Sequence, residues 1–452
     1  MNNYYLFRLR YLLAILFISS IYQTSNSQDW SPLGVGTNNS VNAAVIFNSQ
    51  LIAAGNFSTA GGQSVNHIAS WNGTSWQPLG LGTNGNIHAL VIYNGLLVAG
   101  GEFTAAGGIS ANKIAAWNGS VWSRFDNSII NGNVYSIAVF GTSLIIGGNF
   151  TTVGSTVVNR VARLSSGWFA MGNGFNSTVY ALSVFNSQLF AGGSFTGPGT
   201  VKRIGLWNGV TWITLGTGID DGAVYALKVH NSWLAVGGSF TYIGGSSVNR
   251  IARWNGANWG ILGSGFSSDV NAFYASGTTL YAGGNFDFAD YLPASKVAVY
   301  NGSGWTALGT GIGGTNANVK SIVPYNGKAV FAGTFSLAGG NSANNIATWG
   351  TPIEIKPIAG EVPGSYSLEQ NYPNPFNPVT SIRFSIPSSH MEKVKLTVFD
   401  ISGREVAVLV NNTLAPGKYE VNFDAGNLGS GAYFYKLTAG LYSETKRMVV
   451  VK

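Results

Sequence analysis

VAGGEFT at residues 98–104 is one copy of a pattern that recurs along most of the chain. It returns as IGGNFT at 146–151, AGGSFT at 191–196 and VGGSFT at 236–241. Seven copies are marked by a phenylalanine, at intervals of 45 to 49 residues: Phe57, Phe103, Phe150, Phe195, Phe240, Phe286 and Phe335. A repeat of this length predicts an array of similar units, each built from one small motif of secondary structure.

Each repeat carries the signals of four short strands, most clearly in residues 179–216. The first seven residues of this copy are nearly all apolar, which is typical of a strand buried on both faces. A two-residue turn and a second strand ending in the Gly-Gly motif follow, and the third and fourth strands carry Trp207 and Trp212. Four antiparallel strands per repeat predict the blade of a β-propeller. We therefore expect an all-β, seven-bladed β-propeller over residues 28–350.

The two ends of the repeat region predict how it closes. The seventh copy stops at Gly350 without a fourth strand of its own, whereas WSPLG at 30–34 matches the fourth-strand sequence WQPLG at 76–80. We expect the N-terminal segment to complete the last blade, which would leave no unpaired seam. With Trp30 included, twelve of the thirteen tryptophans fall at third- or fourth-strand positions. This regularity favours packing between blades over an exposed row of sugar-stacking rings.

Composition and the N-terminus predict export. Residues 1–27 have the form of a signal peptide: Arg8 and Arg10 precede an apolar run at 11–21, and small residues follow it. The run is shorter than the ~20 residues that span a bilayer, so we expect a cleaved leader and no transmembrane anchor. The formal net charge is +7, but no basic run is interleaved with aromatic residues, so nucleic-acid binding is not predicted.

A second domain follows the repeats. Residues 351–365 contain three prolines and are expected to form an extended linker. In residues 366–452 tryptophan disappears, and strand signals occur at 382–386, 394–400, 418–423 and 433–437. These signals predict a small immunoglobulin-like β-sandwich.

A ring of cationic residues is the first candidate ligand-binding site. The start of the third strand carries a basic or polar residue in every repeat, and such a ring would suit acidic glycans or phosphate groups. The alternative is that each side chain bonds the backbone carbonyls around it. The candidates are His67, Lys113, Arg160, Arg203, Arg250 and Lys296.

Aspartates of the fifth and sixth repeats form the second candidate site, because they break the symmetry of the array. If their loops converge, they could hold Ca²⁺ or act as an acid/base pair on a glycoside. The alternative is that they are solvated loop residues, since their spacing matches no known metal loop. The residues are Asp220, Asp221, Asp269, Asp287 and Asp290. No catalytic residue is predicted, because the histidines of the repeats have no nucleophile motif near them. Apart from Ca²⁺, no cofactor is expected.

The repeat resembles known propeller families. A strand ending in Gly-Gly and followed by an aromatic pair resembles the Kelch and galactose-oxidase-like propellers. The period and the Phe-Thr after Gly-Gly are still more similar to repeats of fungal cell-polarity markers and related bacterial surface proteins. The copper radical site of the oxidase needs a cysteine joined to a tyrosine, and this chain has no cysteine, so that chemistry is excluded.

The C-terminal domain resembles the sorting domains of the type IX secretion system of Bacteroidota-like bacteria. The resemblance rests on Tyr372-Pro373-Asn374-Pro375, a turn at 400–404 that contains Gly403, and a terminal segment ending at Lys452. It implies that the secretion machinery is a partner. It also implies delivery to the outer cell surface of a Gram-negative bacterium, with removal of the tail and either release or attachment to surface lipopolysaccharide.

Together these features predict a secreted or surface-attached propeller that acts as a non-catalytic binding or adhesion module for carbohydrate or protein. The alternative is a secreted carbohydrate-active enzyme that uses the aspartates of blades five and six. Propellers host both kinds of function, so the fold does not decide between them.

Overall fold

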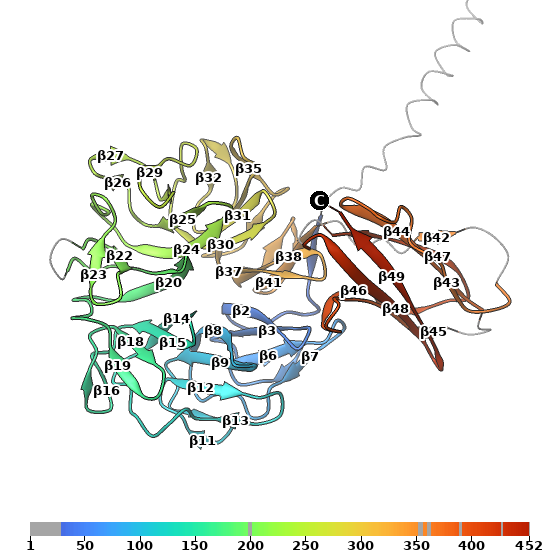
Figure 1. Ribbon diagram of the computed structural model, residues 1–452, viewed down its shortest axis with the longest axis horizontal. Coiled ribbons are helices and arrows are strands. Elements are labelled where there is room, and N and C mark those ends of the chain that lie inside the picture. The colour runs from blue at the N-terminus through green and yellow to red at the C-terminus, as the bar shows by residue number, and fades with distance from the viewer. Residues whose placement is uncertain are drawn as a thin grey trace, which may run out of the picture.

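The computed structural model describes residues 29–197, 201–350, 356–358, 363–387, 391–425 and 428–451. The predicted signal peptide and Lys452 lie outside the described residues. All regular secondary structure in the described ranges is β (Figure 1). Within these ranges no helix has the length and apolar character needed to cross a membrane.

Between residues 29 and 350 the described strands form seven four-stranded antiparallel sheets. Each is a meander in which the first strand pairs with the second, the second with the third and the third with the fourth. The first strands are β2 (Val41–Phe47), β8 (Ile87–Tyr93), β14 (Val134–Phe140), β20 (Val179–Phe185), β24 (Val224–His230), β30 (Val270–Ser276) and β37 (Asn318–Tyr325). The second strands are β3 (Gln50–Gly55), β9 (Leu96–Gly101), β15 (Ser143–Gly148), β21 (Gln188–Gly193), β25 (Trp233–Gly238), β31 (Thr279–Gly284) and β38 (Lys328–Thr334).

The third and fourth strands are shorter. The third strands are β6 (Ile68–Trp71), β12 (Ile114–Trp117), β18 (Val161–Leu164), β22 (Ile204–Trp207), β28 (Ile251–Trp254), β34 (Val297–Tyr300) and β41 (Ile346–Gly350). The fourth strands are β7 (Trp76–Pro78), β13 (Trp122–Ser123), β19 (Trp168–Ala170), β23 (Trp212–Thr214), β29 (Trp259–Gly260), β35 (Trp305–Ala307) and β1 (Asp29–Pro32).

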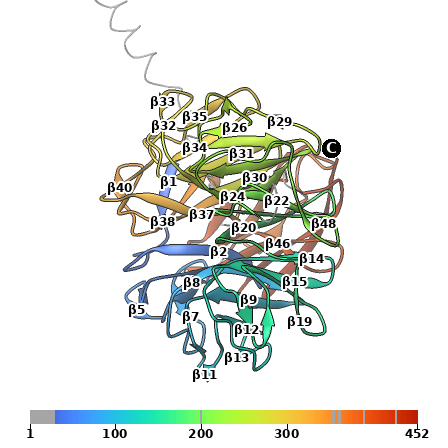
Figure 2. The same cartoon turned by 90° about the vertical axis from the view of Figure 1, so that its left-hand side faces the viewer.

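The first strands lie side by side in a cycle. Each contacts the first strand of the next sheet along the chain, and β2 contacts both β8 and β37. In Figures 1 and 2 these strands surround the middle of the repeat region, while β7, β13, β29 and β35 lie at its periphery. Four-stranded antiparallel sheets in this arrangement are consistent with a β-propeller.

Neighbouring sheets are joined by a repeated tryptophan contact. Trp76 Nε1 donates to the carbonyl of Leu33 at 2.9 Å, and Trp122 Nε1 donates to the carbonyl of Leu79 at 2.8 Å. The tryptophans that begin β23, β29 and β35 make the same bond to the preceding sheet, at 2.9 to 3.1 Å. Trp168 is the exception, because its Nε1 has no partner among the described residues. A buried indole gains most when its N–H finds an acceptor, so each bond fixes one sheet against the next.

The N-terminal segment forms the outermost strand of the last sheet. Strand β1 pairs with β41, and the partners include Trp30 with Trp349 and Ser31 with Thr348. Trp30 is buried, and its Nε1 donates to the carbonyl of Leu308 at 2.9 Å. The segment that follows the predicted leader therefore makes the same contact as the other repeats, but with chain nearly 280 residues away.

The C-terminal region forms two four-stranded sheets around one core. One contains β42 (Lys356–Ile358), β47 (Gly417–Asp424), β44 (Val379–Ile386) and β43 (Ser367–Leu368), in that order. The other contains β46 (Glu405–Leu414), β45 (Glu392–Phe399), β48 (Gly431–Ala439) and β49 (Tyr442–Val450). Strand β42 lies within the segment that we expected to be a linker, and it pairs with β47 at the edge of its sheet, a place where a proline is tolerated.

Replacing Trp30 tests the contribution of β1. Trp30→Ala removes a buried indole and its hydrogen bond, so it should lower the free energy of unfolding by about 3–5 kcal/mol. Ser31→Ala is the matched control: Ser31 contributes its carbonyl to the bond with Thr348, and that carbonyl is kept. The control should change stability by no more than about 0.5 kcal/mol. Equal unfolding curves for the two variants in urea would contradict this role of β1.

Candidate functional site

The loops between second and third strands lie at the same end of the sheets as the connections from one sheet to the next. We call this end the loop-bearing face. Connections and loops are hydrogen-bonded to each other: Asn38, on the connection into the first sheet, accepts from the N–H groups of Ser58 and Thr59 in that sheet's loop, both at 3.0 Å. Most of the loops contain a two-stranded ribbon. The ribbons are β4 (Thr59–Ala60) with β5 (Gln63–Ser64), β10 (Ala105–Ala106) with β11 (Ile109–Ser110), β16 (Thr152–Val153) with β17 (Thr156–Val157), β26 (Tyr242–Ile243) with β27 (Ser246–Ser247), β32 (Phe288–Ala289) with β33 (Leu292–Pro293), and β36 (Ile312–Gly313) with β39 (Leu337–Ala338) and β40 (Asn341–Ser342).

Asp221 takes the place of an asparagine that is used in other repeats. Asn84 accepts hydrogen bonds from two successive backbone N–H groups at 2.9 and 2.8 Å. Asp221 accepts the equivalent pair from Thr241 and Tyr242, at 2.7 and 3.0 Å. Burial raises the pKa of the Asp221 carboxyl, but the hydrogen bonds from these two residues and the charge of Arg203 outweigh it, so the pKa lies below its ordinary value. The carboxylate therefore holds the loop in place.

Three of the other four predicted aspartates also bond to groups around them. Asp287 pairs with Lys296 at 2.6 Å, and Asp290 accepts from two backbone N–H groups at 2.6 and 2.9 Å. Asp220 accepts from one N–H group at 2.8 Å, and Asp269 lies on the connection that leads into β30. No three His, Asp or Glu side chains in the described ranges form a group that could hold a metal ion. The structure does not bring the five aspartates together, and calcium binding by them stays a prediction.

The predicted cationic residues bond to backbone carbonyls. All six have positive φ, between 60° and 75°. Lys113 Nζ donates to the carbonyl of Glu102 at 2.6 Å and Arg203 Nε to that of Gly222 at 2.7 Å. Burial lowers the pKa of the His67 imidazole, whose Nδ1 has no partner in the described part of the chain. The side chains of Arg160, Arg250 and Lys296 also donate to backbone carbonyls. These contacts stabilise the loop-bearing face, and ligand binding by the ring stays a prediction.

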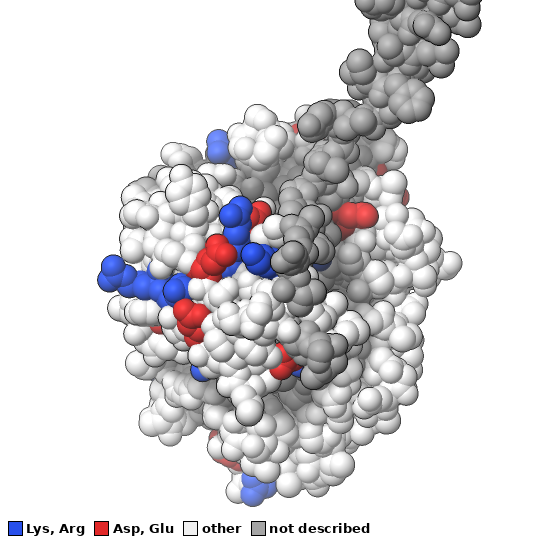
Figure 3. All heavy atoms as spheres, turned by 90° about the vertical axis from the view of Figure 1, so that its right-hand side faces the viewer, with Lys and Arg blue, Asp and Glu red and all other residues white. Residues whose placement is uncertain are grey.

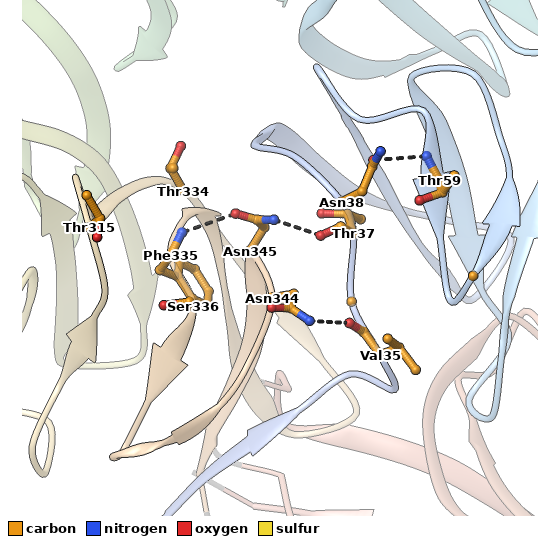
Figure 4. Close-up of a pocket in the computed structure, with 12 residues that line it drawn as sticks. Val35, Thr37, Asn38, Thr59, Thr315, Thr334, Phe335, Ser336, Asn344 and Asn345 are labelled. Carbon is orange, nitrogen blue, oxygen red and sulfur yellow. Dashed lines mark hydrogen bonds between the residues drawn. The ribbon is translucent and has the colours of Figure 1, made fainter.

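A cavity of about 600 Å³ lies on this face where the N-terminal segment meets the seventh sheet. We call it the seam pocket. Equivalent junctions beside Arg160 and Tyr291 hold cavities of only about 380 and 300 Å³. Figure 4 shows side chains from the two segments facing each other across the pocket. They are Val35, Thr37, Asn38 and Thr59 on one side and Thr315, Thr334, Phe335, Ser336, Asn344 and Asn345 on the other.

Two asparagines hold the seam pocket together. Asn345 is buried, and its Nδ2 donates to the carbonyl of Thr37 at 2.8 Å while its Oδ1 accepts from the N–H of Phe335 at 3.1 Å. Asn344 Nδ2 donates to the carbonyl of Val35 at 3.0 Å. These bonds tie residues at opposite ends of the repeat region, so the pocket exists only when the N-terminal segment is in place.

The seam pocket offers neutral hydrogen-bonding groups and no acid or base. None of the twelve residues that line it is titratable. The hydroxyls of Thr59, Thr315 and Thr334 have no hydrogen-bond partner among the described residues, so they are free to bond a ligand. Such a lining fits a neutral ligand with several hydroxyl groups, and it contains nothing that could transfer a proton at neutral pH.

The seam pocket was not predicted from the sequence, because the candidate sites were chosen for their charged residues and this pocket has none. Two signals were nevertheless present. The seventh repeat has Asn345 where six others have a basic side chain, and the longest interval between marker residues, 49 positions, leads to Phe335. The additional residues include Thr315, which lines the pocket.

The predicted sorting-motif residues other than Lys452 lie within the described ranges. Tyr372 is exposed, and Asn374 Oδ1 accepts from the N–H of Val449 at 2.9 Å. Gly403 has a φ of 78° in the turn after β45. In that turn the pKa of the Asp400 carboxyl is lowered to about 2. Hydrogen bonds from Ser402 are the main cause and outweigh the opposite effect of burial, and bonds from Arg404 lower the pKa further. Figure 3 shows acidic and basic side chains next to one another on the side of the molecule that is at the right of Figure 1. Ion pairs of the C-terminal domain include Arg383 with Glu420 and Lys395 with Glu405.

Known protein families match both the repeat region and the C-terminal domain. The secretion system C-terminal sorting domain family matches residues 370–451. A β-propeller domain of unknown function, DUF5122, matches residues 143–175 and 231–256. The sorting-domain match indicates export by the type IX secretion system to the cell surface or the extracellular space, as the motifs predicted. No curated protein matches the chain.

Two solved structures are similar over much of the chain at low sequence identity. A fungal alcohol oxidase of the AA5 family, in complex with copper, is 12% identical with a TM-score of 0.41, and the match covers 94% of this chain and all of that one. A protein of unknown function from Bacteroides thetaiotaomicron is 10% identical with a TM-score of 0.35, over 72% of this chain and 76% of that one. TM-scores this low support no inference about activity.

Two separate variants, Asp221→Asn and Asn84→Asp, test the structural role of the carboxylate. Because the folded-state pKa of Asp221 is lowered, its stabilising effect is present above the ordinary carboxyl pKa of 3.8 and is lost as pH falls through the lower, folded-state value. Melting temperatures measured from pH 7 to pH 2 should fall less steeply at the acid end for Asp221→Asn than for the unmodified protein.

The reciprocal variant is Asn84→Asp, which places a carboxylate at the equivalent position of the second repeat. It should melt normally at neutral pH and gain acid sensitivity. Parallel melting curves for all three proteins would show that the side chain at this position contributes nothing through its charge.

Proposed function

We propose that this chain is an exported, non-catalytic binding protein. In this proposal residues 28–350 form a seven-bladed β-propeller closed by β1. A signal peptide at 1–27 directs the first step of export. Residues 366–452 form an immunoglobulin-like sorting domain that is removed after export. The cycle of contacts between first strands and the pairing of β1 with β41 support the closed propeller. The family match at residues 370–451 supports the role of the tail.

The ligand that we propose for the loop-bearing face is a neutral carbohydrate, bound in the seam pocket. The observation that carries this proposal is the lining, which combines free threonine hydroxyls with amide and backbone groups and has no titratable side chain. A sugar hydroxyl both donates and accepts hydrogen bonds, as these groups do, so each can satisfy the other. The enzyme alternative has less support, because Asp220, Asp221 and Asp290, on which it depends, accept hydrogen bonds from backbone N–H groups of adjacent segments.

Removing hydroxyl groups from the pocket tests this assignment. The mature chain is applied to a glycan array, and its affinity for the best neutral glycan is then measured by calorimetry. Thr315→Val combined with Thr334→Val keeps the side-chain shape but removes two hydrogen bonds, so affinity should fall about tenfold or more. Thr156→Val, on ribbon β17 of the third sheet, is the matched control and should bind normally. Unchanged binding by the double variant, or hydrolysis of the glycan, would contradict the proposal.

Truncation tests the tail. A chain that ends at residue 365 lacks the sorting domain, so we expect it to accumulate in the periplasm while the full chain reaches the surface or the medium. Cell fractionation with an antibody against the repeat region measures the distribution. Leu441→Ala in the full chain, at an exposed residue outside the predicted motif, is the control for substitution in the domain and should be delivered normally. Surface delivery of the truncated chain would show that the export signal lies elsewhere.

A further inference from the structure

All seven first strands carry a β-bulge at the same place. In each, the pairing with the second strand shifts by one residue at the loop-bearing end, so that one residue of the first strand has no partner. The unpaired residues, which we call the bulge ring, are Asn42, His88, Tyr135, Tyr180, Tyr225, Asn271 and Lys320. Bulges redirect a side chain and are frequent beside functional sites.

The second glycine of each Gly-Gly motif is part of this arrangement. A Cβ atom added to Gly101 would collide with the carbonyl oxygen of Asn86, the residue just before β8, and one added to Gly148 would collide with that of Asn133. The motif that marks the repeats thus permits the close backbone approach at the bulge. This explains why the bulge is found in every sheet, but it does not explain which side chains occupy the ring.

The ring is divided by chemistry. Four consecutive sheets contribute aromatic side chains: the ring centroids of His88 and Tyr135 are 4.9 Å apart, those of Tyr135 and Tyr180 are 5.8 Å apart, and those of Tyr180 and Tyr225 are 5.4 Å apart. These four residues, the aromatic arc, are only partly buried, unlike most of the fourth-strand tryptophans. Partly exposed aromatic rings in a row offer a surface on which an apolar ligand face can pack.

The remaining three sheets contribute polar side chains. Lys320 Nζ donates to Asn42 Oδ1 at 3.0 Å, and Asn271 Nδ2 donates to Asn318 Oδ1 at 2.9 Å. These contacts join neighbouring sheets and show that the side chains converge on the middle of the array. The ring therefore has an aromatic side, where His88 Nε2 lies 2.9 Å from a carboxylate oxygen of Glu102, and an amide and ammonium side that carries the charge of Lys320.

Lys320 is a cation without an anionic partner. Its Nζ bonds a neutral amide, and no carboxylate in the described residues forms an ion pair with it. Lys320 is mostly but not fully buried, and burial lowers the pKa of its ammonium group. A partly buried cation is destabilising unless a negative charge compensates it, and a ligand carboxylate would supply that charge.

We propose that the bulge ring binds a carboxylated sugar, such as a uronic acid within a glycan. The carboxylate pairs with Lys320, and an apolar sugar face packs on the aromatic arc. Asn42 and Asn271 hydrogen-bond sugar hydroxyls beside the carboxylate. This site is separate from the seam pocket and does not depend on it, because no residue of the ring lines that pocket.

The experiment compares acidic glycans with the same glycans after carboxyl reduction. The mature chain is tested by array and calorimetry against oligomers of galacturonate, glucuronate and mannuronate and against their reduced forms. At least one uronate should bind about tenfold or more tightly than its reduced counterpart, which is the size of effect expected for one charge-assisted pair. Failure to bind any uronate, or equal binding of both forms, would overturn the proposal.

Variants separate the two sides of the ring. Lys320→Met should abolish the preference for the acidic form, with Lys320→Gln as a second variant if the first is unstable. Tyr180→Ala should weaken both forms, whereas Tyr180→Phe, which keeps the ring, should not. Lys202→Met, at an exposed lysine on the loop before β22, is the control for general charge. A preference that survives loss of Lys320 would overturn the proposal. The seam-pocket double variant should bind uronates normally. Loss of binding at one site can therefore be told apart from loss of binding at the other.

Discussion

An indole N–H donating to a backbone carbonyl of the preceding sheet is the contact on which the rest of the structure depends. Six fourth-strand tryptophans make it, at 2.8 to 3.1 Å, and all but one of these bonds are buried. Because each bond is directional and joins two sheets, it fixes their relative placement as well as their separation. The first strands are then held in a cycle, and the loops of successive sheets meet at one face.

The same contact closes the array only if the chain returns to its beginning. Five of the six bonds join residues 41 to 44 positions apart, whereas Trp30 reaches Leu308 from the opposite end of the repeat region. The seam pocket is a consequence of that return, since Asn344 and Asn345 bond the segment that follows β1. A function assigned to this pocket therefore depends on closure.

Much of the fold could be predicted from the sequence because it is repeated. The strand order, the Gly-Gly motif and the match of WSPLG to WQPLG each have several copies to compare. Strands β44, β45, β47 and β48 were also expected close to where they lie, whereas β46 and β49 were not. The site was not predictable in the same way. Lys113 and Arg203 suggested a cationic surface, but their donors are used by backbone carbonyls, a three-dimensional fact that residue type does not reveal. Lys320 and Tyr180 were overlooked because a bulge cannot be recognised in a strand that reads as continuous.

The sorting domain has its own core, and the two sites proposed for binding lie elsewhere, on the ring of sheets. Closure by β1 is the central claim, and the absence of native cysteine allows a direct test. Ser31 and Thr348 are paired across β1 and β41, so Ser31→Cys combined with Thr348→Cys should form an intramolecular disulfide on oxidation and raise the melting temperature. Free thiols after oxidation, or disulfides only between molecules, would contradict the account.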